Sequence, residues 1–354
     1  MLSWLSGRTR ILVSLSVALA AIYLAHHLDI SAISITDIFK TNNSSAIIVD
    51  KLADVADTAS AKMSSTGADL AMPATTSKAD SPSKMPVYFF SHGGPTVQYD
   101  TKHPAYPVLQ KIGKEITHKL KPKAVIVFSA HWMGDEDVIH VNSKEQTDLI
   151  YDFYGFPAHF YKAKYPNKGS PELANKIIDT LAEAGIKSLP VKRGLDHGVW
   201  SGFSVAFNPE TNPLNVPLVQ VSLFKSEDPR SHYALGRALS HLRQEGVVMI
   251  GAGMSVHNLG DLHLMSNGNS KPLPYAVSFD KAIKAAVEVD PSEREGKMAE
   301  LCRRPDARQA HPFMDHLMPL YIAAGAAYED RGRQTWTMQE GSMAWAQYRF
   351  GAVP

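Results

Sequence analysis

Short apolar runs alternate with longer amphipathic stretches from residue 85 to the end of the chain, and this alternation constrains the fold most strongly. Four runs rich in β-branched and aromatic residues are typical of buried strands: 86–90, 124–130, 216–223 and 246–253. Four stretches have helical periodicity: 104–120, 171–185, 229–244 and 275–288. Strands that alternate with helices predict an α/β fold, a single domain with a central, largely parallel or mixed sheet flanked by helices.

Three of the predicted strands lead to a histidine at their carboxyl end. His92 follows the first in VYFFSHGGP, His131 the second in VIVFSAHW, and His257 the fourth in VVMIGAGMSVHNLG. Because ligands of open α/β sheets bind outside the carboxyl ends of the strands, we expect the active site at this edge. The chain has 15 histidines and one cysteine, Cys302, which favours imidazole or carboxylate metal ligands over thiolates.

Two further histidines stand at positions that suit a site. His197 lies between an acid and a glycine in RGLDHGVWSGF, which we interpret as a loop. His316 comes three residues before Pro319, which is expected near the first turn of a helix that runs to about residue 329. The start of a helix is a rigid position for a ligand. Either residue could instead be an ordinary hydrogen-bonding histidine.

Aromatic side chains close to these histidines suit an aromatic substrate, although each could also pack the core or its rim. They are Trp132, Tyr154, Phe156 and Trp200. Other ligand classes fit less well. A formal net charge of +1 gives no electrostatic footprint for nucleic acid. The glycines of SHGGP are not followed by Lys-Ser or Lys-Thr, and GAGMSVHNLG is not a dinucleotide fingerprint.

The N-terminal part of the chain differs from the rest. Arg8 and Arg10 precede an uncharged, mostly apolar run at 11–25, which is short for a spanning helix of about 20 residues but suits a signal-peptide core. Residues 1–39 are therefore interpreted as a single-pass membrane anchor, with a cleaved signal or an organelle-targeting sequence as alternatives. Residues 40–84 have too little apolar surface to fold and are predicted to be a linker before a catalytic domain at 85–354.

Seven motifs in this order resemble the class III extradiol ring-cleaving dioxygenases of the LigB type, over about residues 85–354. The motifs are SHGGP, SAHW, FPAHFYKAKYPNKGSPELA, GLDHGVWSGF, VQVSLF, GAGMSVHNLG and HLMPLYIAAGA. The chain is most similar to the single-chain branch related to 4,5-DOPA dioxygenase. The resemblance implies an oxidoreductase that opens the ring of a catechol, such as DOPA or a related aromatic diol, with O₂.

The same resemblance implies one divalent metal ion per chain, held by His92, His131 and His316. Many extradiol enzymes use two histidines and a carboxylate for Fe²⁺, whereas the third position here is a histidine, as in catalytic zinc sites. Either Zn²⁺ or Fe²⁺ is therefore expected, with Fe²⁺ required for ring opening. Asp315 is adjacent to His316, but neighbouring side chains at a helix start are expected to point apart.

The resemblance also implies that two histidines transfer protons during the reaction. His257 matches the acid/base residue, and His197 matches a histidine that contacts the substrate hydroxyl or bound oxygen. His311 is a further candidate beside the metal and substrate. Two alternatives stay open: a zinc-dependent hydrolase or lyase on the same histidines, and a non-catalytic relative, which would be expected to lose these bases.

Overall fold

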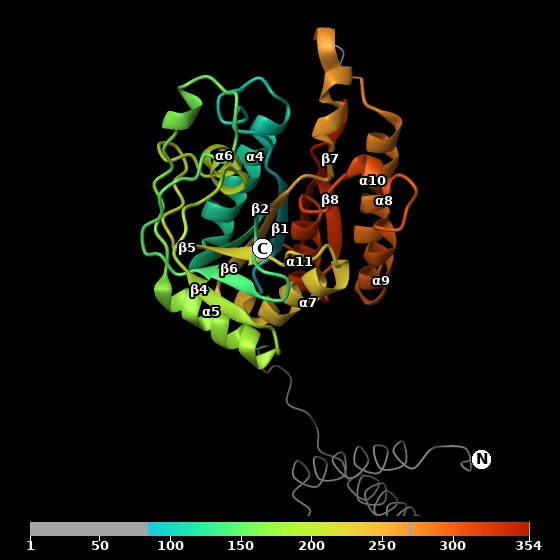
Figure 1. Ribbon diagram of the computed structural model, residues 1–354. Helices are drawn as coiled ribbons and strands as arrows, with labels where there is room; N and C mark the ends of the chain where they lie inside the picture. Colours follow the sequence, from blue (N-terminus) through green and yellow to red (C-terminus); the bar gives the residue numbers. More distant parts are fainter. Residues whose placement is uncertain (1–83, 269–270, 354) are drawn as a thin grey trace, which may run out of the picture. The chain divides into compact units, whose positions relative to one another are not determined.

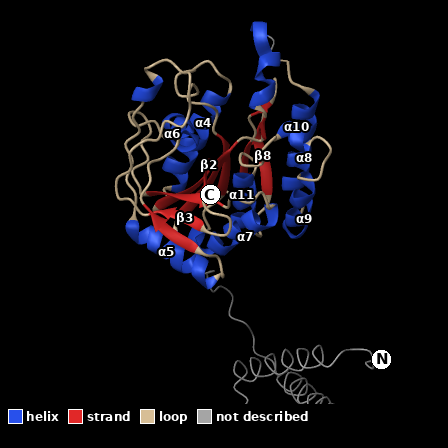
Figure 2. Cartoon of the chain, viewed as in Figure 1, coloured by secondary structure: helices blue, strands red, loops and turns tan. Residues whose placement is uncertain are grey.

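Four parallel strands form the centre of the sheet, and two of them, β1 and β2, lead to His92 and His131 at their carboxyl ends. The computed structural model describes residues 84–268 and 271–353, and within them the main sheet has eight strands in the order β4-β3-β5-β2-β6-β1-β11-β8 (Figures 1 and 2). The central strands are β5 (Leu218–Leu223), β2 (Ala124–Met133), β6 (Val247–Gly253) and β1 (Val87–Ser91). The sheet is mixed, which confirms the predicted fold class.

The outer strands introduce the antiparallel pairs. β3 (Ile139–Asn142) runs antiparallel to β5, and β4 (Ser188–Val191) runs parallel to β3. On the other side, β11 (Gln347–Phe350) pairs antiparallel with β1 and with β8 (Gly332–Trp336). A small sheet joins β7 (Val256–His257), β10 (Met343–Ala344) and β9 (Gln339–Glu340), so β7 and its histidine are tied to the C-terminal part of the chain.

Alternate residues of the central strands face two separate cores, as the pleat of a strand requires. Val87 and Phe89 belong to one core, while Tyr88 and Phe90 belong to the other. Helices on the first side are α5 (Pro171–Glu183), α7 (Pro229–Leu239), α8 (Pro274–Val287), α9 (Pro291–Leu301), α10 (Ala307–Ala310) and α11 (Met318–Ala327). Helices on the second side are α4 (Ala105–Lys114) and α6 (His197–Ala206) (Figure 1). Both faces of the sheet are covered.

Shorter helical turns extend or connect these elements. They are η1 (Glu115–Leu120), η2 (Phe160–Lys162), η3 (Ser240–Glu245) and η4 (Leu259–Gly268). The four predicted strands and four predicted helices are all confirmed, with η1 and η3 completing the stretches 104–120 and 229–244. The helix expected after His316 is α11. In contrast, α6 begins at His197, where the sequence was interpreted as a loop.

The start of α11 lies directly against the end of β6, and two glycines make this approach possible. A Cβ atom at Gly251 would lie 2.2 Å from the carbonyl oxygen of Pro319, and one at Gly253 would lie 2.1 Å from that of His316. Because both obstacles are backbone atoms, only glycine fits at either position. The backbone of His316 is therefore fixed by the sheet.

The expectation of a membrane-anchored protein must be corrected. Across 84–268 and 271–353, no helix is long and apolar enough to cross a bilayer. The apolar run at 11–25, interpreted as the anchor, lies outside the described residues. The transmembrane segment and the membrane localisation are therefore withdrawn. The domain limits expected at residues 39 and 84 stay predictions.

Candidate metal centre

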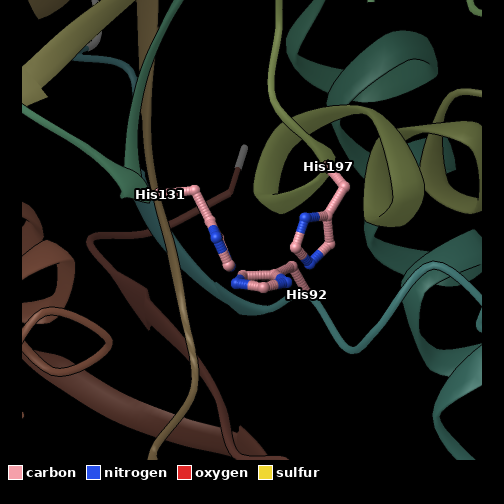
Figure 3. A group of neighbouring side chains, drawn as sticks. All are labelled: His92, His131 and His197. Carbon is pink, nitrogen blue, oxygen red and sulfur yellow. The ribbon is translucent and has the colours of Figure 1, made fainter. Parts of the chain in front are cut away.

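Five histidines from separate segments meet at the carboxyl edge of the central strands. His92 follows β1, His131 lies near the end of β2, His197 starts α6, His257 ends β7, and His316 precedes α11. The ring centroid of His131 lies 4.1 Å from that of His197 and 4.8 Å from that of His316. The rings of His92, His131 and His197 face one another in Figure 3. The clustering of histidines that the strand ends predict is therefore present in the fold.

The ring nitrogens in this group are spaced as metal ligands would be. His92, His131 and His197 each offer one ligand atom, and these atoms lie within 4.8 Å of one another. Nε2 of His131 lies 3.2 Å from Nε2 of His316. Two nitrogens bound at about 2.0–2.1 Å to one tetrahedral ion would be about 3.3 Å apart. Nε2 of His92 is buried with no hydrogen-bond partner, as expected for an atom that needs an ion.

Burial keeps two of these imidazoles neutral, which is the form that binds a metal. Burial and the neighbouring histidines hold the pKa of both His92 and His316 well below the ordinary value. Burial also acts to lower the pKa of His131, but the hydrogen bond with Asp152 and the charge of Asp196 outweigh it, so this pKa is raised. The site thus combines two neutral imidazoles, those of His92 and His316, with that of His131, whose pKa is raised by nearby carboxylates.

For His92 and His131, the other ring nitrogen, Nδ1, lies against an acceptor outside the cluster. Nδ1 of His92 lies 2.6 Å from the carbonyl oxygen of Gly93. Nδ1 of His131 lies 3.2 Å from Oδ2 of Asp152. Such acceptors fix the orientation of metal-binding histidines and leave Nε2 for the ion. Nδ1 of His316 lies 3.2 Å from Oδ1 of Asp315 but makes no hydrogen bond. The expectation that Asp315 points away from His316 is therefore wrong.

Asp152 also contacts His197, whose Nδ1 lies 2.9 Å from Oδ1 of the carboxylate. Burial would raise the pKa of Asp152, but the hydrogen bonds with His131 and His197 hold it far below its ordinary value. Sequence reasoning missed this residue. The available signal was an acid between aromatic residues in YDFYGFP, a loop without helical or strand periodicity.

Asp196 is a second acid that sequence reasoning left without a role. It is fully buried, and it accepts hydrogen bonds from Ser129, Arg193 and Gln220 at 2.6–2.8 Å. Arg193 also donates to the carbonyl oxygen of His131 at 3.3 Å. This network ties the end of β2 to the start of α6, the two elements that carry His131 and His197.

His257 lies against the candidate ligand His316. Its ring stacks on that of His316, with centroids 3.5 Å apart and an angle of 10° between the planes. Burial, with smaller effects from His311 and His131, lowers the pKa of His257 to about 3. At neutral pH this imidazole is therefore uncharged, with one ring nitrogen that can accept a hydrogen bond.

Three residues expected to contact the substrate are buried, and two of them have a packing role. Trp200 is fully buried among aromatic rings, and its indole N–H donates to the carbonyl oxygen of Ile150 at 3.0 Å. His311 is fully buried against Phe279, with Nε2 2.8 Å from the carbonyl oxygen of Ser255. The substrate-binding role expected for these two residues stays a prediction. Trp132 is 6% exposed and lies under the guanidinium of Arg193.

The chain also matches known proteins over most of its length. Residues 83–351 match the family model of the catalytic LigB subunit of aromatic ring-opening dioxygenase. The 4,5-DOPA dioxygenase extradiol of Beta vulgaris is 38% identical over 269 residues, which cover 74% of this chain and 95% of that protein. The enzyme of the same name from Escherichia coli K12 is 31% identical, covering 70% of this chain and 86% of its own length.

A solved structure shares the fold as well. It is an uncharacterized protein, JW3007, from Escherichia coli K12, with a TM-score of 0.61 and 27% sequence identity, covering 76% of this chain and all of that one. The predicted enzyme class, an oxidoreductase of the ring-opening dioxygenase type, is confirmed by these matches, and the hydrolase and non-catalytic alternatives are not favoured. The chain belongs to the LigB family of extradiol ring-opening dioxygenases, in the branch of the 4,5-DOPA dioxygenases.

Proposed function

We propose that this dioxygenase opens the ring of a small catechol, with DOPA or a related aromatic diol as the substrate class, and that O₂ is the second substrate. The observation that carries the proposal is the convergence of His92, His131 and His316 beside His257, in a chain that matches DOPA dioxygenases over most of its length. The catalytic part is inferred to be residues 85–354.

His92, His131 and His316 would hold one divalent metal ion. The pair of Nε2 atoms 3.2 Å apart, the unpartnered Nε2 of His92, and the acceptors on Nδ1 of His92 and His131 support this ligand set. Fe²⁺, when bound, would supply the redox chemistry that a reaction with O₂ requires, whereas Zn²⁺ has no redox chemistry. Three imidazoles also suit Zn²⁺, so we expect either ion to bind and only Fe²⁺ to support ring opening.

His257 and His197 are proposed to handle protons of the substrate. Each would accept the proton of a catechol hydroxyl at a ring nitrogen, and His257 would return it as the ring opens. A correctly placed acid or base contributes about 10²–10⁴-fold to a rate. The hydrogen bond of Asp152 to Nδ1 of His197 supports this role, because it leaves Nε2 of that ring to face a substrate.

Oxygen consumption tests the proposal. The full chain would be purified free of metal, reloaded anaerobically with Fe²⁺ or Zn²⁺, and mixed with a panel of catechols in an oxygen electrode. Uptake with Fe²⁺ alone, with a yellow ring-opened product and its loss in His257→Gln, is the expected result. A catechol consumed equally with Zn²⁺, or no uptake with either ion across the panel, would reject the proposal.

A further inference from the structure

One carboxylate, that of Asp152, contacts both a candidate metal ligand and a candidate proton carrier. Its Oδ2 atom lies 3.2 Å from Nδ1 of His131, and its Oδ1 atom lies 2.9 Å from Nδ1 of His197. Oδ1 also accepts the backbone N–H of His197 at 3.0 Å. We propose that Asp152 is a positioning residue that fixes the tautomer of both rings; the link to ring opening rests on the proposed function.

The physical basis is that an ionised carboxylate has only acceptors. Each imidazole that meets it through Nδ1 must carry its proton on Nδ1, so the lone pair of each neutral ring is on Nε2. For His131 this is the atom that lies 3.2 Å from Nε2 of His316, within the candidate ligand set. For His197 it is the atom left to receive a proton. The same side chain thus prepares both rings.

The two oxygens of Asp152 are not equivalent, and this gives a specific test. Oδ1 receives two N–H groups of His197, one of which is a backbone group that cannot change its role. In Asp152→Asn the amide oxygen should therefore stay at the Oδ1 position, and the amide NH₂ should face His131. Nδ1 of His131 must then accept, so its proton moves to Nε2 and blocks the lone pair that would bind the ion.

The experiment compares the parent chain with Asp152→Asn, both labelled with ¹⁵N in histidine and free of metal. Nitrogen–proton correlation spectra at alkaline pH, where the imidazoles are neutral, report which ring nitrogen carries the proton. The parent should show Nδ1–H at both His131 and His197. In Asp152→Asn, His131 should change to Nε2–H while His197 stays the same. Zinc affinity, measured against a competing chelator, should fall by about 10–100-fold.

Asp148→Asn is the matched control, because it makes the same change four residues earlier in the chain. The side chain of Asp148 is 89% exposed and pairs with Lys144 at 2.8 Å. This variant should keep the parent tautomers and zinc affinity, and circular dichroism should show that both variants are folded. If Asp152 had only a structural role, Asp152→Asn would weaken folding but would not move the proton of the His131 ring from Nδ1 to Nε2.

Two results would overturn the assignment. One is an Nε2–H tautomer of His131 or His197 in the parent chain, which decides the matter even if Asp152→Asn does not fold. The other is a folded Asp152→Asn variant with unchanged tautomers and a zinc affinity within twofold of the parent. Neither measurement uses a catechol or O₂. A chain with the expected tautomers that fails to open catechols would reject the proposed function and leave the role of Asp152 standing.

Discussion

Replacing Gly253 by alanine should displace the proposed metal ligand His316. A Cβ atom at residue 253 would lie 2.1 Å from the carbonyl oxygen of His316 and 3.2 Å from the ring of Phe89. The carbonyl oxygen also accepts the N–H of Met254 at 3.0 Å, so it is held on the strand side. Because the obstacle is backbone, no change of rotamer can relieve the clash, and the segment before α11 must move away.

The size of the effect follows from this contact. Restoring an ordinary carbon–oxygen separation requires a shift of His316 by about 1 Å. Overpacking of this kind costs about 1–3 kcal/mol of unfolding free energy. A misplacement of about 1 Å at a catalytic centre can cost about 10²-fold in rate. Gly253→Ala should therefore unfold at a lower urea concentration, bind zinc at least several-fold more weakly, and lose most ring-opening activity with Fe²⁺.

Gly296→Ala provides the control for the change from glycine to alanine. Gly296 lies in α9, and a Cβ atom there would have nothing within 4 Å. This variant should gain up to about 1 kcal/mol from the better helix propensity of alanine and should bind zinc as the parent does. A Gly253→Ala variant with the zinc affinity and urea midpoint of the parent would refute the conclusion that β6 fixes the position of His316.

Four other substitutions have defined outcomes. His316→Gln should lower the metal content after dialysis, measured by atomic absorption, whereas His257→Gln should keep the metal and slow ring opening by about 10²–10⁴-fold. Burial lowers the pKa of His232 to about 4 from 6.5, so the unfolded state takes up the proton first. The protein should therefore lose about 3 kcal/mol of unfolding free energy as the pH falls from about 6.5 to 4, and His232→Leu should remove this loss in urea denaturation curves. Gly236→Ala would place a Cβ atom 1.9 Å from the carbonyl oxygen of Ile322, where α7 crosses α11, and should cost about 1–3 kcal/mol in the same assay while leaving zinc affinity nearly unchanged.

The histidines at strand ends were predictable because two rules of sheet architecture coincide. Buried apolar runs identify the central strands, and the carboxyl ends of parallel strands share one edge. β1, β2 and β6 are parallel neighbours in the sheet, so His92 and His131 have to lie close together once these strands are recognised. His257 follows β6 by a short connection and joins them.

The helix that carries His197 could not be recognised in the same way. All ten residues of α6 are buried, so it has no polar face and no amphipathic pattern. Its glycines, Gly198 and Gly202, lower helix propensity. Gly198 is needed because a Cβ atom there would lie 2.5 Å from Ser129 Oγ and 2.7 Å from a ring carbon of His131. The helix depends on packing against segments about 70 residues earlier in the chain.

Asp315 shows why the orientation of a ligand is harder to predict than its identity. The expectation that it points away from His316 assumed helical backbone, but α11 begins at Met318. Before the helix, the carboxylate of Asp315 is free to accept the N–H of His316 at 2.8 Å and to approach Nδ1 of its ring. Its counterpart for His131, Asp152, comes from a distant loop, and that for His92 is a backbone oxygen. The imidazoles can be found in the sequence, but the acceptors on Nδ1 of His92 and His131, and the approach of Asp315 to His316, arise only from the fold.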